Sequence, residues 1–188
     1  MNSSLGGTSM SLRDVSMIYL LGEDAGHRSF VRAWLNANGV HVHRLYVVEP
    51  TAGKSGGSKF VLANCKATVN DARRRNSTKG ETRVIIAIDA DDNTVEERVS
   101  EIRRTIDERG AGDDLDLVCV LVPRRHIETW AQALGSAQGQ VNEQDNYKPK
   151  TTEEIKSAAR RLAGLRSAPA APPSLAHGYA QFQRLKDM

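Results

Sequence analysis

The 188-residue chain is poor in cysteine, in aromatic residues and in long apolar runs. Its two cysteines, Cys65 and Cys119, are too few and too far apart for a metal knuckle or a disulfide framework, so we expect reduced thiols in the core. The longest apolar stretches have the length of single strands and fall far short of the ~20 residues that span a bilayer. Aromatic residues make up only 5% of the chain, which leaves few rings to stack on exposed bases.

The chain also lacks a large excess of basic or of acidic residues. The chain has 26 basic and 23 acidic residues, so its net charge of +3 does not by itself select nucleic acid or any other partner. Residues 1–14 are polar and contain no apolar signal-peptide core, so we expect a flexible leader on a cytoplasmic protein that does not enter the membrane. The remaining length fits one α/β domain over 15–135 and a helical or irregular extension over 136–188.

The pattern of apolar residues predicts strands that alternate with helices. Continuous apolar runs of strand length predict a sheet that is buried on both faces, and stripes with helical spacing predict the segments between them. Right-handed crossovers then require a mostly parallel, four-stranded sheet with helices on both faces, which is a three-layer, Rossmann-like α/β fold with a C-terminal helical appendage. The expected strands are 15–21, 44–49, 82–89 and 116–123, and the expected helices are 27–38, 58–75, 94–110, 126–135, 151–164 and a short one that ends at 188.

Acidic residues follow the expected strands at the edge where parallel α/β sheets bind their ligands. Glu23 comes after the first strand, and Asp89 and Asp91 come at the end of the third. Carboxylates that converge in this way repel one another, and Mg²⁺ or Mn²⁺ is the natural compensating ion. If the strand stays extended, Asp89 and Asp91 point the same way and can share one ion, while Glu23 holds a second metal or accepts a proton.

Several neighbouring acidic residues also have simpler, structural interpretations. Asp24 is suited to cap the helix that follows it, and Asp92 with Asn93 is suited to a cap or a solvated turn. Glu128 lies in the first turn of a helix, where the helix dipole alone favours an acid, although a catalytic or structural role at the site is the alternative.

Basic residues near the same edge are candidates for binding a phosphate. Arg124 and Arg125 follow the fourth strand, where they either grip a phosphate or pair with the carboxylates. His27 lies one turn after Glu23 and either reaches the site or stays in solvent. Lys54 and Lys59 belong to a glycine-rich segment, TAGKSGGSK, whose spacing does not match a P-loop.

The acidic motifs support a family resemblance. LLGED after the first strand and IIAIDADDN after the third resemble the TOPRIM domain, the metal-binding module of topoisomerases, primases and overcoming-lysogenisation-defect nucleases. The segment VPRRHIETWAQAL resembles a stretch in small stand-alone TOPRIM-like proteins found among bacterial defence genes. The resemblance implies that Glu23 is the acid/base or metal residue and that Asp89 and Asp91 bind Mg²⁺ for phosphoryl transfer.

Two classes of function remain open from the sequence. The first is a Mg²⁺- or Mn²⁺-dependent nuclease that cleaves DNA or RNA in defence against phage or plasmids, with Glu23, Asp89, Asp91 and Glu128 as its catalytic residues. The second is a non-catalytic subunit that binds nucleic acid or a separately encoded ATPase, and either form could assemble into oligomers. A haloacid dehalogenase-type phosphohydrolase fits less well, because in that family the D-x-D motif follows the first strand.

Overall fold

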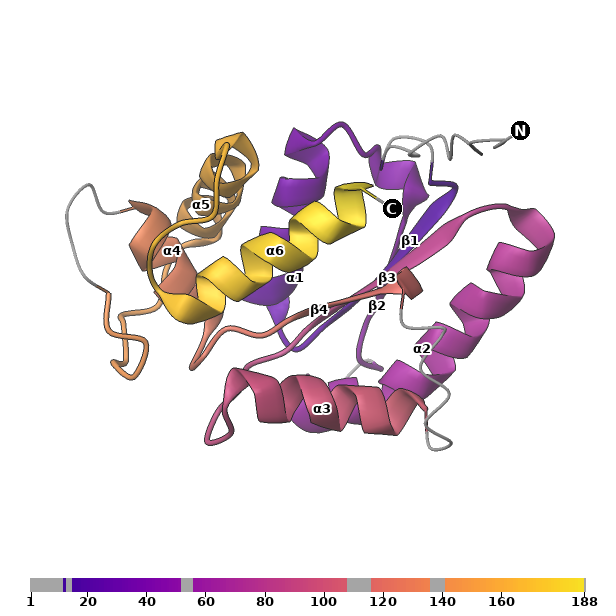
Figure 1. The fold of residues 1–188 in the computed structure, drawn as a ribbon, viewed down its shortest axis with the longest axis horizontal. Helices are drawn as coiled ribbons and strands as arrows, with labels where there is room; N and C mark the ends of the chain where they lie inside the picture. Colours follow the sequence, from indigo (N-terminus) through magenta and orange to yellow (C-terminus); the bar gives the residue numbers. More distant parts are fainter. Residues whose placement is uncertain (1–11, 13–14, 52–55, 108–115, 136–140, 188) are drawn as a thin grey trace, which may run out of the picture.

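The computed structural model describes residues 12, 15–51, 56–107, 116–135 and 141–187, and it shows an α/β fold built on one sheet (Figure 1). The sheet is four-stranded and entirely parallel, as the sequence predicted. The elements in chain order are β1 (Met17–Gly22), α1 (Ala25–Ala37), a 3₁₀ turn η1 (Val42–Arg44), β2 (Leu45–Val48), α2 (Ser58–Lys79), β3 (Thr82–Ala87), α3 (Val95–Ile106), β4 (Val118–Leu121), α4 (Ile127–Gly135), α5 (Thr152–Gly164) and α6 (Pro173–Asp187).

The order of the strands creates a switch point at the centre of the sheet. The strands lie in the order β2-β1-β3-β4, so the chain leaves β1 toward one side to form β2 and later crosses to the other side to form β3. In open parallel sheets the crevice for a ligand lies at such a point, outside the carboxyl ends of the strands. Gly22 lies opposite Ala87 in the β1–β3 register, so Glu23 and the residues after Ala87 emerge together at this switch point.

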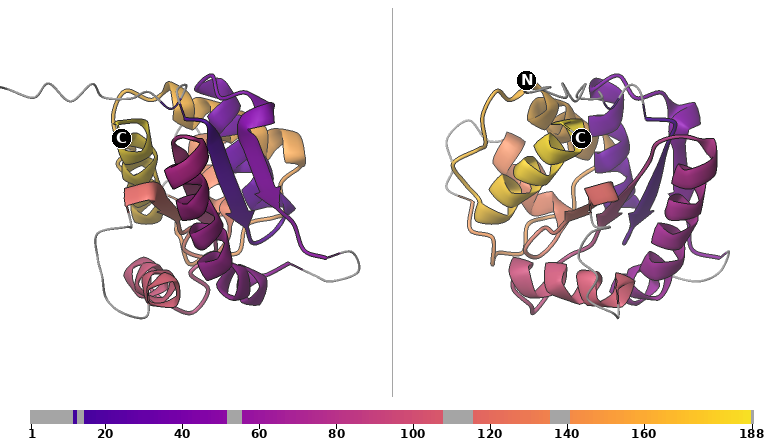
Figure 2. Two further views of the ribbon diagram at one scale, coloured as in Figure 1. Left: turned by 90° about the vertical axis from the view of Figure 1, so that its right-hand side faces the viewer. Right: turned by 45° about the vertical axis from the view of Figure 1, so that its right-hand side comes forward.

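Helices cover both faces of the sheet in a three-layer, Rossmann-like arrangement (Figure 2). Along β3, Ile85 and Ala87 pack on one side with α1, α4, α5 and α6, whereas Val84 and Ile86 pack on the other side with α2 and α3. This alternation is the period of two that a strand imposes. Because helices cover both faces of the sheet, the residues of β3 from Val84 to Ala87 are apolar on both sides.

The C-terminal helices share the core of the α/β domain. Trp34 of α1 stacks on Phe182 of α6 with ring centroids 3.9 Å apart, and Phe30 meets Trp130 edge-on at 5.8 Å. Leu12, which the sequence assigned to the leader, is buried in the same cluster. The segment expected as an appendage therefore supplies two helices of this core cluster, α5 and α6.

Local sequence signals fixed most helix starts correctly. Thr94 and Glu97 form the predicted capping box of α3. The expected helix 94–110 ends at Ile106, and its predicted terminator Gly110 lies outside the described residues. Cys65 and Cys119 are buried thiols, as expected. Among the described helices, none has both the length and the apolar character needed to cross a bilayer.

The contact between α6 and α4 gives a test of this packing. A Cβ added at Gly178 would lie 2.3 Å from an atom of the buried Trp130 ring, whereas one added at Gly164, at the end of α5, would meet no atom within 4 Å. We predict that Gly178→Ala lowers the free energy of unfolding by about 2 kcal/mol through overpacking, and that Gly164→Ala leaves it within about 0.5 kcal/mol. Urea denaturation measures both, and equal stability of the two variants would contradict the packing.

Candidate metal centre

Glu23 and Asp89 are joined directly at the switch point. The Glu23 N–H donates to the Ala87 carbonyl at 2.9 Å and continues the β1–β3 ladder by one bond. The side chain of Glu23 then turns toward β3, where its Oε2 accepts a hydrogen bond from the Asp89 N–H at 2.8 Å. The two carboxylates are therefore held side by side by the backbone of the two central strands.

His27 completes the group from the first turn of α1. Its side chain is fully buried, and its Nε2 lies 2.9 Å from Asp89 Oδ1. Its Nδ1 lies 2.9 Å from Asp24 Oδ1, and the same oxygen accepts the His27 backbone N–H as the N-cap of α1. The capping role predicted for Asp24 is confirmed. The alternative of a solvent-exposed His27 is wrong, because the imidazole is buried between two carboxylates and has no surface left for a phosphate.

Three side chains have the spacing of a metal site. Glu23, His27 and Asp89 each offer one ligand atom, and these atoms all lie within 4.8 Å of one another. Ligands about 2.1 Å from a small divalent cation lie up to about 4 Å apart, so the group is close to the spacing that an ion requires. Two carboxylates and one imidazole are a donor set suited to a divalent cation such as Mn²⁺ or Mg²⁺.

Burial and mutual charge set the ionisation of this group. Burial raises the pKa of Glu23, and the Asp89 carboxylate adds to this rise while its N–H opposes it. Burial disfavours the charged form of His27, but the carboxylates of Asp89 and Asp24 outweigh it and hold the pKa of the imidazole well above its ordinary value. Burial also opposes ionisation of Asp24, yet its bonds to His27 lower its pKa. In the metal-free protein, a protonated His27 therefore neutralises part of the acidic cluster.

The structure gives Asp91 a different position from the one expected. The strand ends at Ala87, and Asp91 has a left-handed backbone with φ of 55°, so it does not continue an extended D-x-D. Its Oδ2 accepts a hydrogen bond from the buried Arg98 at 3.1 Å. Burial and the nearby Asp89 raise the pKa of Asp91, while Arg98 opposes the rise. Asp91 thus lies beside the metal-capable group without belonging to it.

Arg98 is a residue of the site that sequence reasoning missed. Its guanidinium donates to the carbonyls of Asp89 and Ala90 at 2.9 and 3.2 Å, so it fixes the loop that carries both aspartates. Together with Val95, Ile102 and Ile106 it forms the buried face of α3. The sequence did contain a signal for this role, because an arginine at a core position of an amphipathic helix indicates a buried polar partner.

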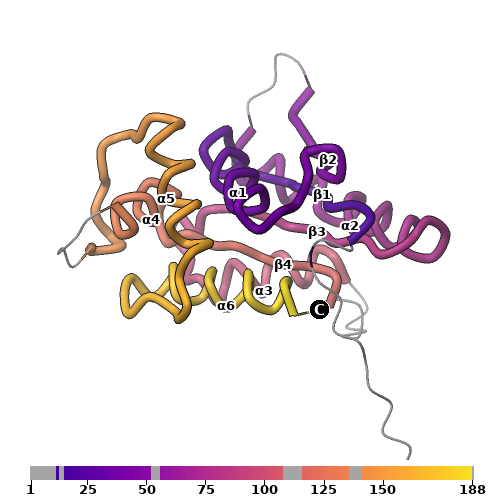
Figure 3. The backbone as a smooth tube through the Cα atoms, turned by 90° about the horizontal axis from the view of Figure 1, so that it is seen from above, coloured from indigo at the N-terminus to yellow at the C-terminus, as the bar shows by residue number. Residues whose placement is uncertain are grey.

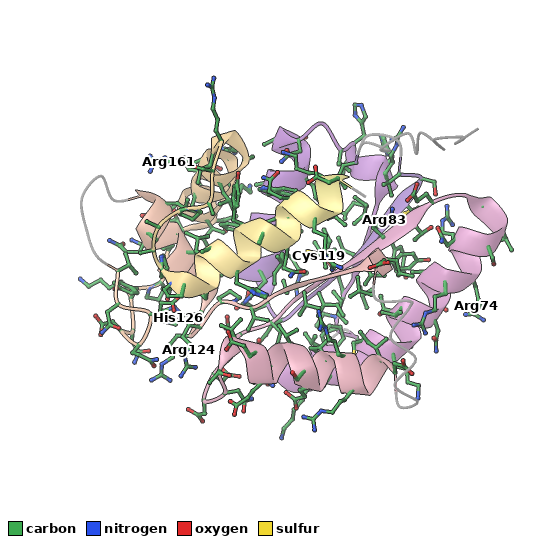
Figure 4. The ribbon with its side chains drawn as sticks, viewed as in Figure 1. Arg74, Arg83, Cys119, Arg124, His126 and Arg161 are labelled. Carbon is green, nitrogen blue, oxygen red and sulfur yellow. The ribbon has the colours of Figure 1, made fainter. Side chains whose placement is uncertain are left out.

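The two arginines after β4 have different roles. Arg124 donates to the carbonyls of Asp91 and Asn93 at 2.7 and 2.5 Å, so it holds the loop instead of pairing with a carboxylate. Arg125 is half-buried and interacts electrostatically with Asp91. Its Nε is buried with no hydrogen-bond partner among the described residues. Figure 4 shows Arg124 and His126 close together near the start of α3.

The other expected residues are more peripheral. Glu128 lies in the first turn of α4, with its Oε2 3.8 Å from His126 Nδ1, and it is outside the group of three. Lys59 is exposed in the first turn of α2, and Lys54 lies outside the described residues. The glycine loop does reach the site, because the Gly57 N–H donates to the Glu23 carbonyl at 2.9 Å. A Cβ at Gly56 would lie 2.2 Å from that same carbonyl oxygen, so glycine is required there.

The fold and this site define a Rossmann-like α/β protein with a metal-capable acidic centre at the switch point. Comparison with known proteins adds no closer assignment: no protein-family model, curated protein or solved structure matches the chain.

The buried ion pairs predict a pH dependence of stability for the metal-free protein. Asp24, whose pKa is lowered, contributes stability above its unfolded value near 3.8, and this is lost as the pH falls. His27, whose pKa is raised, contributes stability that is complete below about 6.5 and is lost as the pH rises toward the folded value. We predict that wild type exceeds Asp24→Asn in stability most between about pH 4 and 6.5. Urea titrations in EDTA check this, and a difference that grows above that range would contradict it.

Proposed function

We propose that this protein is a Mn²⁺- or Mg²⁺-dependent phosphodiesterase that cleaves DNA or RNA, similar in its active site to TOPRIM nucleases. The observation that carries the proposal is the joining of Glu23 and Asp89 across β1 and β3, with a buried histidine beside them. Acidic residues from these two positions are also what the resemblance implies. Glu23, His27 and Asp89 would hold the ion, which supplies charge stabilisation at the phosphate when bound.

The protein's own groups account for the rest of the chemistry. Glu23 is only part-buried and has a raised pKa, which suits it to accept the proton of the attacking water. Asp24 and Asp89 hold the His27 ring between them, and Arg98 fixes the backbone of the loop that carries Asp89. Arg125 lies close enough to this loop to interact electrostatically with Asp91, and in this proposal its guanidinium binds a phosphate oxygen of the substrate.

Metal binding tests the ligand set directly. We predict that Asp89→Asn weakens Mn²⁺ binding by more than about 100-fold, since a missing ligand costs more than a missing outer partner. Asp91→Asn, the matched control in the same loop, should weaken it by less than about tenfold, because Asp91 is bound to Arg98. Isothermal titration of the EDTA-stripped protein measures both. Equal losses in the two variants would reject this ligand set.

Cleavage tests the function. The protein with Mn²⁺ should cut labelled DNA or RNA, and Asp89→Asn should abolish cutting while circular dichroism shows an intact fold. We predict that Arg125→Gln lowers kcat/KM by about 10- to 100-fold through the loss of one charge-assisted phosphate contact. Arg74→Gln is the matched control, since Arg74 is an exposed arginine on α2 that Figure 4 places far from Arg124.

Two results would overturn the enzymatic proposal. Cleavage that persists in Asp89→Asn would come from another site or a contaminant. Binding of Mn²⁺ without cleavage of single- or double-stranded DNA or RNA would instead support the non-catalytic binding subunit.

A further inference from the structure

A second concave site lies away from the metal centre. A cavity of about 540 Å³ is formed by α1, α5 and the segment from Val40 to Leu45. Figure 3 shows α5, α1 and β2 in a row from left to right, and residues of these three elements line the cavity. Its volume lies within the range of about 300 to 1,000 Å³ that is usual for small-molecule sites.

The charged side chains that line this cavity are all basic. Arg32 comes from α1, His41 from the turn before η1, and Lys156 and Arg160 from α5. No acidic side chain lines the cavity within the described part of the chain, although the chain as a whole has 23 acidic residues against 26 basic ones. Permanently charged cations from two helices, α1 and α5, therefore converge on this one cavity.

These cations are only partly neutralised by their surroundings. Arg32 is exposed and has neither an ion pair nor a hydrogen bond to any described residue. Lys156 and Arg160 share a single carboxylate, that of the exposed Glu153, at 3.9 and 2.9 Å. Three permanent positive charges thus face one negative charge at the rim, so the cavity attracts anions.

The remainder of the cavity lining includes an apolar part. Leu35 and Val40 are buried beneath it, and Leu45 and Val42 line its side. Val42 is 60% exposed, which makes it one of few large apolar residues left at the surface of the described chain. An apolar or ring-shaped body resting on this apolar part would remove Val42 from water while its charged group meets the arginines.

The cavity is distinct from the metal centre. Leu45 pairs with Ile18, five residues before Glu23 along β1, so at a rise of about 3.3 Å per residue the Leu45 end of the cavity lies roughly 16 Å from Glu23 along the strand. None of Glu23, His27 and Asp89 lines the cavity. A ligand in the cavity would therefore touch α1 between Ser29 and Asn36, on residues other than His27.

We infer that this cavity binds an organic phosphate of mononucleotide size, with the phosphate between Arg32 and Arg160 and the ring system on the apolar part that includes Val42. Arginine favours phosphate because its planar fork matches two phosphate oxygens. A ligand that has both a phosphate and an apolar ring fits this lining better than a ligand that has only one of them.

AMP, adenosine and inorganic phosphate separate the two contributions. Isothermal titration in EDTA should show saturable binding of AMP, with adenosine and inorganic phosphate each at least about tenfold weaker. The double variant R32Q/R160Q should weaken AMP binding by at least about tenfold, because two charge-assisted bonds are lost. Both arginines are exposed in the structure, so these substitutions leave the core intact.

Matched controls distinguish this site from the metal centre. R74Q removes an exposed arginine on α2, and D89N removes a metal ligand, so neither should change AMP affinity. Failure to bind AMP at about 5 mM, affinity unchanged in the double variant, or affinity lost in D89N would each overturn the inference. The first two outcomes would not affect the proposed phosphodiesterase activity. A variant that loses cleavage but keeps its AMP affinity would bear on the metal centre alone.

Discussion

The parallel pairing of β1 with β3 is the constraint on which the candidate centre depends. Glu23 and Asp89 are separated by 66 positions in sequence, yet the strand register places them next to each other, and the Asp89 N–H bonds the Glu23 carboxylate. The same pairing creates the switch point, because β2 lies on one side of β1 and β3 on the other. The topology therefore places the two acids at the same edge of the sheet, where parallel α/β sheets bind their ligands.

Charge balance explains why the neighbourhood of these acids is so rich in buried cations. Three carboxylates, those of Glu23, Asp24 and Asp89, surround one imidazole, while Arg98 and Arg124 bind the backbone of the adjacent loop. The histidine balances the cluster in the absence of an ion and offers a nitrogen ligand in its presence. The arginines keep the loop in place in either state, so the geometry of the centre does not rely on the metal to form.

The sequence predicted the sheet and its helices well because β3 and β4 are buried on both faces and the helix caps carry local signals. It located Glu23 and Asp89 for the same reason, since strand ends can be read from where apolar runs stop. It failed at Asp91, because the left-handed turn after β3 has no sequence signal as strong as a glycine, and at His27, because its burial depends on packing between α1 and the end of β3. The role of Arg98 and the cavity beside α5 depend on contacts between distant segments, and the periodicity of apolar residues does not predict such contacts.

The position of a bound ion tests the account most directly. Crystals grown with Mn²⁺ should show one anomalous peak at the carboxyl ends of β1 and β3, within bonding distance of carboxylate oxygens of Glu23 and Asp89 and of a ring nitrogen of His27. A structure in which Mn²⁺ is absent from this position, or is held elsewhere while His27 stays bonded to Asp24 and Asp89, would contradict it.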